Sequence, residues 1–200
     1  MEQNHGGASI RNLIVERLLE GARIMESIAD DDQLTDCISK SIDLCNSCIE
    51  SGGKILFMGN GGSAADSQHL ATELVSRYLK EREALPALAL TVDSSAITAI
   101  GNDYSFEYIF SRQVEALCKV EDVVIGISTS GNSSNVVNGI KAANSLGSKT
   151  ISLTGNDGGE LAGVSMHSII VPSKSTPLIQ QAHIAIGHIL CEMIEARQSR

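Results

Sequence analysis

The feature that most constrains the fold is a set of five short β-rich runs that alternate with longer segments of helical periodicity. The runs are KILFM (54–58), ALALTV (87–92), DVVIGIS (122–128), KTISLT (149–154) and SIIVP (168–172). The first three are nearly all apolar, as expected of strands that are buried on both faces of a parallel sheet. Strands that alternate with helices predict an α/β protein with a doubly wound, five-stranded parallel sheet.

Two helices are predicted ahead of the first strand. Apolar residues recur at helical spacing from Ile10 to Ile28 and again from Leu34 to Ile49, and Gly52 then interrupts the pattern. A further helix, from about Thr176 to Arg197, is predicted at the end of the chain.

A single domain is expected. The chain has 200 residues with 42% hydrophobic content, enough for one well-buried core and short for two, and no repeat or linker divides it. We expect one domain over residues 1–200, with N-terminal helices in 1–52 and an α/β core in 53–200.

Charge and cysteine content exclude several classes of function. The formal net charge of −9 disfavours nucleic acid as a partner, because phosphate-backbone binding requires clustered Lys and Arg. No apolar run approaches the roughly 20 residues of a membrane helix, and no secretory signal is recognisable, so we expect a cytoplasmic protein without a membrane partner. The five cysteines include the pair Cys45 and Cys48, which we interpret as buried thiols rather than disulfides or zinc ligands.

The loop after the first strand, GNGGS (59–63), could hold a ligand. Its three glycines let the backbone turn tightly and approach a bound molecule, and Ser63 is a candidate N-cap, with Asp66 as an acidic variant of the capping box. A plain strand-to-helix turn is an equally good interpretation.

The loop after the third strand, STSGNSSN (128–135), is a candidate phosphate site. Hydroxyl groups, backbone N–H groups and the positive end of the following helix would attract a phosphate without Lys or Arg. An acidic protein can therefore bind a phosphorylated metabolite locally, and we favour this interpretation over a serine-rich surface turn.

Several side chains are candidates for metal binding or acid/base chemistry. His69 and Glu73 are four residues apart and share a helix face, where they could bind one divalent metal or form a solvated ion pair. In the last helix, His183 and His188 are both candidates, and spacing does not distinguish them. The segment beginning GNDY (101–104) brings Asn102 and Asp103 to the head of an amphipathic helix, as capping residues or ligand contacts.

Taken together, four stretches resemble one family. They are GNGGSAADSQHLATEL (59–74), AIGNDYSFEYIFSRQVEAL (99–117), GISTSGNSSNV (126–136) and SLTGNDGGELAG (152–163), followed by a helix that carries Gln180 and His188. The chain resembles the phosphoheptose isomerases of the sugar isomerase (SIS) domain superfamily over nearly its whole length. The resemblance implies a flavodoxin-like SIS fold and isomerisation of sedoheptulose 7-phosphate to D-glycero-D-manno-heptose 7-phosphate for bacterial surface polysaccharides.

The resemblance also implies a homotetramer with one divalent metal per subunit, commonly zinc. The implied metal ligands are His69, Glu73, Gln180 and His188. The implied substrate contacts are Asn60, Gly61, Gly62, Glu73, Asn102, Asp103, Ser128, Thr129, Ser130, Ser133 and Gln180. Glu73 and His188 are the expected acid/base pair for proton transfer through an enediol, with Glu73 sharing the metal only loosely.

Two hypotheses remain open from the sequence. A non-catalytic relative in the same superfamily binds the bacterial replication initiator, but it lacks the matching glutamate and last histidine, and Glu73 and His188 favour the enzyme.

Gln180 and His188 are ~12 Å apart along one continuous helix. We therefore expect either that the last helix begins late, after Pro177, or that the active site is assembled from more than one subunit.

Overall fold

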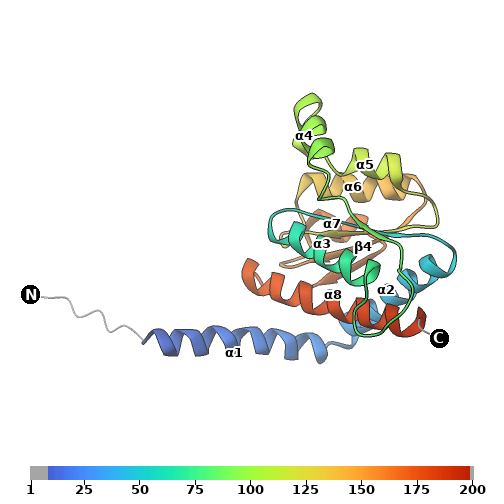
Figure 1. Ribbon diagram of the computed structural model, residues 1–200. Helices are drawn as coiled ribbons and strands as arrows, with labels where there is room; N and C mark the ends of the chain where they lie inside the picture. The colour runs from blue at the N-terminus through green and yellow to red at the C-terminus, as the bar shows by residue number, and fades with distance from the viewer. Residues whose placement is uncertain (1–8, 199–200) are drawn as a thin grey trace, which may run out of the picture.

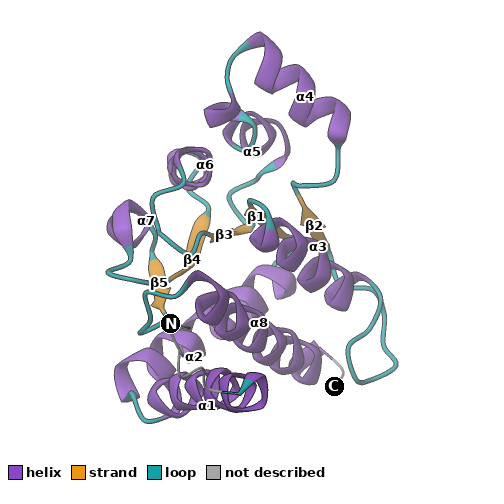
Figure 2. Ribbon diagram, turned by 90° about the vertical axis from the view of Figure 1, so that its left-hand side faces the viewer, coloured by secondary structure: helices purple, strands orange, loops and turns teal. Residues whose placement is uncertain are grey.

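The computed structural model describes residues 9–198, and these form a five-stranded sheet between two layers of helices (Figures 1 and 2). All strands are parallel, in the order β2-β1-β3-β4-β5, which is the flavodoxin-like order. The strands are β1 (Ile55–Gly59), β2 (Ala87–Ala89), β3 (Val123–Ile127), β4 (Lys149–Thr154) and β5 (His167–Ile170). This confirms the predicted fold class and all five strands.

Figure 2 shows the sheet edge-on, with helices on both sides. The helices on one side are α1 (Ile10–Ala29), α2 (Asp32–Glu50), α3 (Gly62–Val75) and α8 (Thr176–Gln198). Those on the other side are α4 (Ser94–Asp103), α5 (Ser111–Leu117), α6 (Ser134–Ser145) and α7 (Gly159–Val164), and a 3₁₀ turn, η1 (Phe106–Tyr108), precedes α5. No helix within residues 9–198 is both long and apolar enough to cross a membrane.

Alternate residues of the central strands divide between two cores. Ile55 and Phe57 of β1 pack in the cluster beneath α2, α3 and α8, whereas Leu56 and Met58 pack beneath α5 and α6. Every residue of β1 and β3 is buried, as the apolar runs predict. Cys45 and Cys48 are buried free thiols, which confirms that interpretation.

Helix α1 extends away from the body of the subunit (Figure 1). Its periodicity is helical as predicted, but only Ile28 is buried. Ile10 and Leu18 are 78% and 70% exposed, so most of the apolar face of α1 is uncovered within one chain.

Three local predictions need correction. The second strand is only three residues long, because the chain turns after Leu90 and Asp93 then caps α4. Asn102 and Asp103 lie in the last turn of α4 and not at the head of a helix. Helix α8 begins at Thr176 as predicted, but the alternative of a late start after Pro177 is wrong. Pro177 lies in the first turn, where a missing N–H costs nothing, so Gln180 is part of the continuous helix.

Candidate active site

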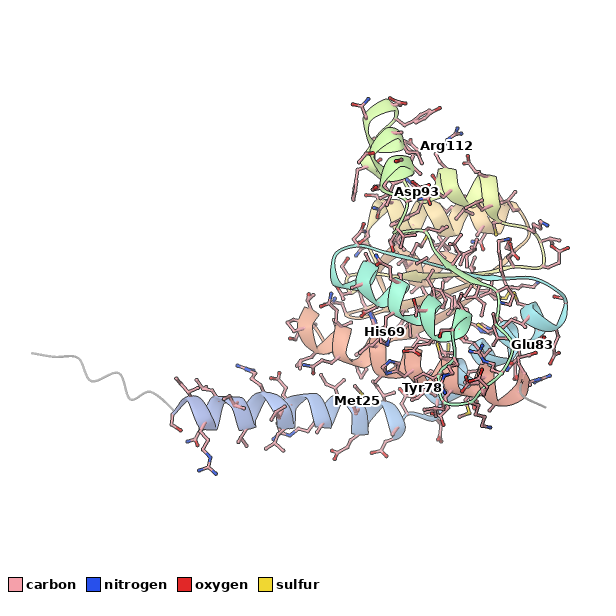
Figure 3. All side chains as sticks on the ribbon, in the orientation of Figure 1. Met25, His69, Tyr78, Glu83, Asp93 and Arg112 are labelled. Atoms are coloured by element: carbon pink, nitrogen blue, oxygen red, sulfur yellow. The ribbon has the colours of Figure 1, made fainter. Side chains whose placement is uncertain are left out.

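Three side chains with metal-binding atoms meet between α3 and α8. His69 and Glu73 project from α3, and His188 from α8. His69 Nε2 is 2.8 Å from His188 Nε2 and 3.1 Å from Glu73 Oε1. The three ligand atoms all lie within 4.8 Å of one another. Figure 3 shows His69 on α3, above α8.

These three atoms fit a divalent metal. Zn²⁺ binds imidazole nitrogen and carboxylate oxygen at about 2 Å, which places tetrahedral ligand atoms about 3.3 Å apart. The separations of 2.8 and 3.1 Å are close to that value. His69 is largely exposed and Glu73 and His188 are half-buried, so the site is open to a substrate on one side.

The close approach of α3 and α8 depends on a glycine in α8. A Cβ added to Gly187 would lie 2.6 Å from both terminal carbons of Leu70, which leaves no space for a larger residue. The Cys191 thiol also donates to the Leu70 carbonyl at 3.7 Å. Leu70 and Gly187 directly adjoin His69 and His188, so this contact sets the distance between the two histidines.

Gln180 lies at a different place along the contact between α3 and α8. Its side-chain amide packs against Gly62 in the first turn of α3, where an added Cβ would be 2.6 Å from Nε2. His188 is eight residues further along α8, ~12 Å along the axis. Within one chain the structure therefore places Gln180 near the glycine loop, while it brings Glu73 and His188 together without a second subunit.

His183 is a structural residue. It is 1% exposed, and its Nε2 donates a hydrogen bond to the Thr154 carbonyl at 3.0 Å. Burial lowers the His183 pKa to about 4, so the ring is neutral at physiological pH. Of the two candidate histidines in α8, only His188 faces the cluster.

The start of α3 differs from the predicted cap. The N-cap residue is Gly61, with φ of 55°, and Ser63 lies inside the helix without capping it. A Cβ on Gly59 would be 2.7 Å from the Ser63 carbonyl oxygen, so the strand turns directly into the helix. Asp66 is not a capping residue either. One of its carboxylate oxygens is buried without a hydrogen bond among the described residues, and burial raises its pKa, partly offset by His69 and His188.

The hydroxyl groups of the predicted phosphate loop converge at the N-terminus of α6. Ser128 Oγ lies 2.9 Å from Ser133 Oγ and 3.4 Å from Ser130 Oγ. Ser133 is the N-cap residue, yet its side chain makes no capping bond, so its hydroxyl can face a ligand. Thr129 is half-buried in the same loop, and its carbonyl accepts from Asn156. A phosphate here would meet hydroxyls and free N–H groups together.

The remaining predicted contacts fall into two groups. Asn60 exchanges two hydrogen bonds, 2.8 and 2.9 Å, with Asn135 at the start of α6, which joins the glycine loop to the hydroxyl loop. Asn102 and Asp103 are exposed and bonded to each other at 2.9 Å. Among the described residues, no hydrogen bond connects that pair to the other candidate residues.

Sequence reasoning missed three residues at this site. Tyr78 stacks on His188, and the buried pair Arg82 and Glu195 holds the segment that carries it. One signal was available for Glu195, which follows His188 by seven residues and therefore lies on the same face of α8.

Residues 20–155 match the SIS domain family. Phosphoheptose isomerase of Aquifex aeolicus is 58% identical over 147 residues, 74% of this chain and 77% of the relative. Phosphoheptose isomerase of Nitratiruptor sp. is 50% identical over 182 residues, 91% of this chain and 96% of the relative.

A solved structure is also similar. The fold matches phosphoheptose isomerase GmhA of Neisseria gonorrhoeae with a TM-score of 0.88 and 40% identity, over 94% of this chain and all of that one. With its five-stranded parallel sheet and its histidine and glutamate cluster, the chain belongs to the SIS domain family and, within it, to the phosphoheptose isomerases.

Proposed function

We propose that this protein converts sedoheptulose 7-phosphate to D-glycero-D-manno-heptose 7-phosphate, and so supplies heptose for bacterial surface polysaccharide. The observation that carries the proposal is the convergence of His69, Glu73 and His188 in one chain whose relatives are phosphoheptose isomerases. A ketose becomes an aldose when a proton moves between C1 and C2 through an enediol, and this needs a base and an acid beside the carbonyl end of the sugar.

We assign these roles to side chains of the cluster. Glu73 takes a proton from C1 and His188 gives one to the C2 oxygen, which forms the enediol; Glu73 then returns its proton to C2 while His188 takes the proton of the C1 hydroxyl, which leaves the C1 aldehyde. Because Nε2 of His188 would bind the metal, this proton is held on its Nδ1. His69, Glu73 and His188 would hold a divalent metal, zinc by our proposal, with Gln180 as the further ligand implied by family resemblance. Such a metal, when bound, stabilises negative charge on a substrate oxygen. Because Glu73 is proposed to act as base, we infer that it binds the metal less tightly than the histidines.

The phosphate end of the sugar is assigned to the loop before α6. Ser128, Thr129, Ser130 and Ser133 would donate hydrogen bonds to it, assisted by the N-terminus of α6. Asn60, Gly61 and Gly62 border the sugar between the two ends, and the Asn60–Asn135 pair supports this placement. Asn102 and Asp103 are proposed as contacts to the sugar hydroxyls.

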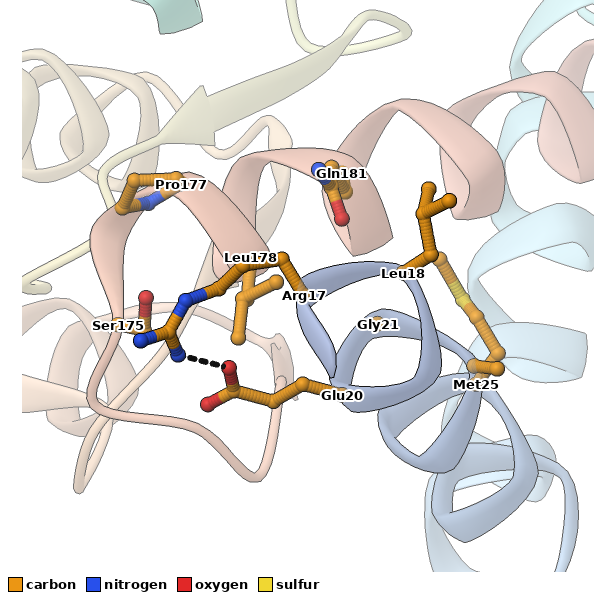
Figure 4. A pocket seen from close by; sticks show the side chains of 10 residues that line it. Arg17, Leu18, Glu20, Gly21, Met25, Ser175, Pro177, Leu178 and Gln181 are labelled. Carbon is orange, nitrogen blue, oxygen red and sulfur yellow. Dashed lines mark hydrogen bonds and ion pairs between the residues drawn. The ribbon is translucent and has the colours of Figure 1, made fainter. Parts of the chain in front are cut away.

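We infer that residues 1–200 are one cytoplasmic SIS domain and that it assembles as a homotetramer. Two hollows beside α8 support self-association. One, of about 480 Å³, is lined by apolar residues of α1, α2 and α8 that include Ile28, Ile42 and Ile189. The other, of about 530 Å³, lies between α1 and the start of α8, beside Gly21, Gln181 and the Arg17–Glu20 ion pair (Figure 4).

The test is direct. Purified protein loaded with zinc is incubated with sedoheptulose 7-phosphate, and the anomeric proton of an aldose phosphate is followed by NMR. His188→Gln serves as the inactive control and should bind the sugar phosphate without turnover. A parent protein that binds the sugar phosphate and never forms the aldose would refute the proposed reaction and favour a binding protein.

A further inference from the structure

The segment between α3 and β2, residues 76–86, is irregular in conformation yet firmly held. Glu195 of α8 is 1% exposed and accepts three backbone hydrogen bonds from it. The donors are the N–H groups of Tyr78, Leu79 and Lys80, at 2.8, 2.7 and 2.9 Å. A buried carboxylate that accepts three N–H bonds fixes the backbone at this point.

Arg82 adds a second anchor to the same carboxylate. Its Nε lies 3.2 Å from Glu195 Oε1, and both side chains are almost completely buried. The guanidinium also donates to the carbonyl oxygens of Glu73, Ser76 and Glu83, at 2.9, 3.3 and 2.9 Å. Arg82 therefore connects Glu195 to the turn of α3 that carries Glu73.

This anchored segment places the ring of Tyr78 on the imidazole of His188. The two ring centroids are 5.6 Å apart, and the planes are inclined by 28°. That distance lies within the usual 4.5–7 Å of stacked aromatic pairs. Glu195 and His188 are two turns apart on one face of α8, so one helix provides both the anchor for the Tyr78 backbone and the ring beneath its side chain.

A histidine in a helix needs such a contact if its ring is to keep one orientation. The last torsion of a histidine side chain is broad, and rotation about it would turn Nε2 away from His69. Outer contacts that orient a ligating imidazole commonly change metal affinity or activity 10- to 100-fold when they are lost.

We propose that Tyr78 is a positioning residue of the active site, held by the Arg82–Glu195 pair, and that its ring keeps His188 Nε2 directed at His69 and Glu73. The inference rests on the proposed function in one respect, since it takes His188 to be a metal ligand. It goes further because it assigns a role to a segment that contributes no ligand.

The experiment uses three variants of the full chain. Tyr78→Leu keeps an apolar side chain but removes the ring, and Tyr78→Phe keeps the ring but removes the hydroxyl. Leu79→Ala is the matched control, because Leu79 is 62% exposed and its N–H bond to Glu195 is unaffected by the change. Zn²⁺ affinity is measured by competition with a chelating dye, and the His188 ring proton is observed by NMR and assigned with His188→Gln.

We expect Tyr78→Leu to weaken Zn²⁺ binding about 10- to 100-fold and to shift the His188 ring proton, because the aromatic ring above it is gone. In turnover, kcat should fall with little change in KM, since the phosphate loop is untouched. Tyr78→Phe and Leu79→Ala should match the parent in all three measurements. Unchanged Zn²⁺ affinity and an unshifted His188 resonance in Tyr78→Leu would overturn the inference, and so would an equal loss in Tyr78→Phe.

Two of these measurements need no sugar. A parent protein that fails to isomerise sedoheptulose 7-phosphate, while Tyr78→Leu still loses Zn²⁺ affinity, would refute the proposed reaction and leave the positioning role standing.

Discussion

Glu195→Gln should be among the most destabilising single substitutions in this chain, although it only replaces one carboxylate oxygen by an NH₂ group. In the parent, Oε2 accepts from Leu79 and Lys80, while Oε1 accepts from Tyr78 and faces Arg82. A glutamine can keep its oxygen at the position of Oε2. Its NH₂ group then takes the place of Oε1 and faces the Tyr78 N–H and the Arg82 guanidinium. The Tyr78 N–H loses its acceptor, and the buried Arg82 cation loses the opposite charge that faces it.

The expected loss of stability can be estimated from the burial of the Arg82–Glu195 pair. Breaking a buried ion pair by removing one partner costs about 3–5 kcal/mol, because the remaining charge is left uncompensated. For a domain of this size each kcal/mol shifts Tm by about 2–4 °C, so we expect a decrease of about 6–20 °C. Glu83→Gln is the matched control, since Glu83 is exposed and Arg82 contacts only its backbone carbonyl.

The pH dependence gives an independent check. Burial raises the pKa of Glu195, but the three backbone N–H groups and Arg82 outweigh this effect and hold the pKa below its ordinary value of 4.5. A depressed pKa in the folded state means that the stabilisation is complete above the unfolded pKa and is lost as pH falls through the folded one. The stability difference between parent and Glu195→Gln, measured by urea unfolding at equal protein concentration, should therefore be constant from pH 6 to 8 and shrink below about pH 4.5.

A second variant separates the ion pair from the backbone bonds. Replacing a buried ion pair by apolar residues is often neutral, so Arg82→Met with Glu195→Leu would recover stability if the pair alone mattered. Here three N–H groups would stay unsatisfied, at about 1–3 kcal/mol each, and the double variant should remain unstable. Full recovery, or a loss from Glu195→Gln no larger than that from Glu83→Gln, would refute this reasoning.

Three further predictions concern the site. Glu73→Gln should lower kcat ~10²–10⁴-fold while the protein still binds the sugar phosphate, and a rate close to that of the parent would exclude Glu73 as the base. Replacing Ser130 and Ser133 by alanine should raise KM strongly with the fold intact, and unchanged affinity for the sugar phosphate in a titration would place the phosphate elsewhere. His188→Gln should abolish Zn²⁺ binding and turnover, whereas His183→Gln should reduce stability and keep Zn²⁺ affinity. Equal losses of Zn²⁺ affinity would contradict the assignment to His188.

The parts of the fold that were predictable are those in which one local pattern decides the structure. The runs around Ile55 and Val123 predict strands buried on both faces, and their alternation with helices predicts a doubly wound parallel sheet. The flavodoxin-like strand order was implied by the family resemblance, because such an alternation is compatible with more than one order. The pairing of His69 with Glu73 follows from helical spacing within α3.

The parts that were not predictable depend on contacts between distant segments. Ser63 is a good N-cap residue by local rules, but the close packing of Gly59 on its backbone starts α3 two residues earlier, with Gly61 as the N-cap. The Arg82–Glu195 pair joins residues that no periodicity relates, and neither was singled out from the sequence. Asn102 could equally begin or end a helix, because small polar residues are common at both ends.

The placement of Gln180 leads to one more prediction, about subunits. Metal–ligand bonds are ~2 Å long, and the Gln180 amide lies against Gly62 while His188 faces His69. If Gln180 is a metal ligand, as family resemblance implies, it must serve the site of another subunit.

Mixing experiments separate the two cases. Glu73→Gln mixed with His188→Gln under subunit exchange should recover no activity, because every site takes both residues from one chain and lacks one of them. Glu73→Gln mixed with Gln180→Ala should recover part of it, since the intact cluster of the Gln180→Ala chain can then receive Gln180 from its neighbour. Recovery in the first mixture would show that Glu73 and His188 act from different chains, against the 2.8 and 3.1 Å contacts that unite the cluster here. Confirmed mixed oligomers without recovery in the second would mean that Gln180 acts within its own chain, at the glycine loop where the structure places it.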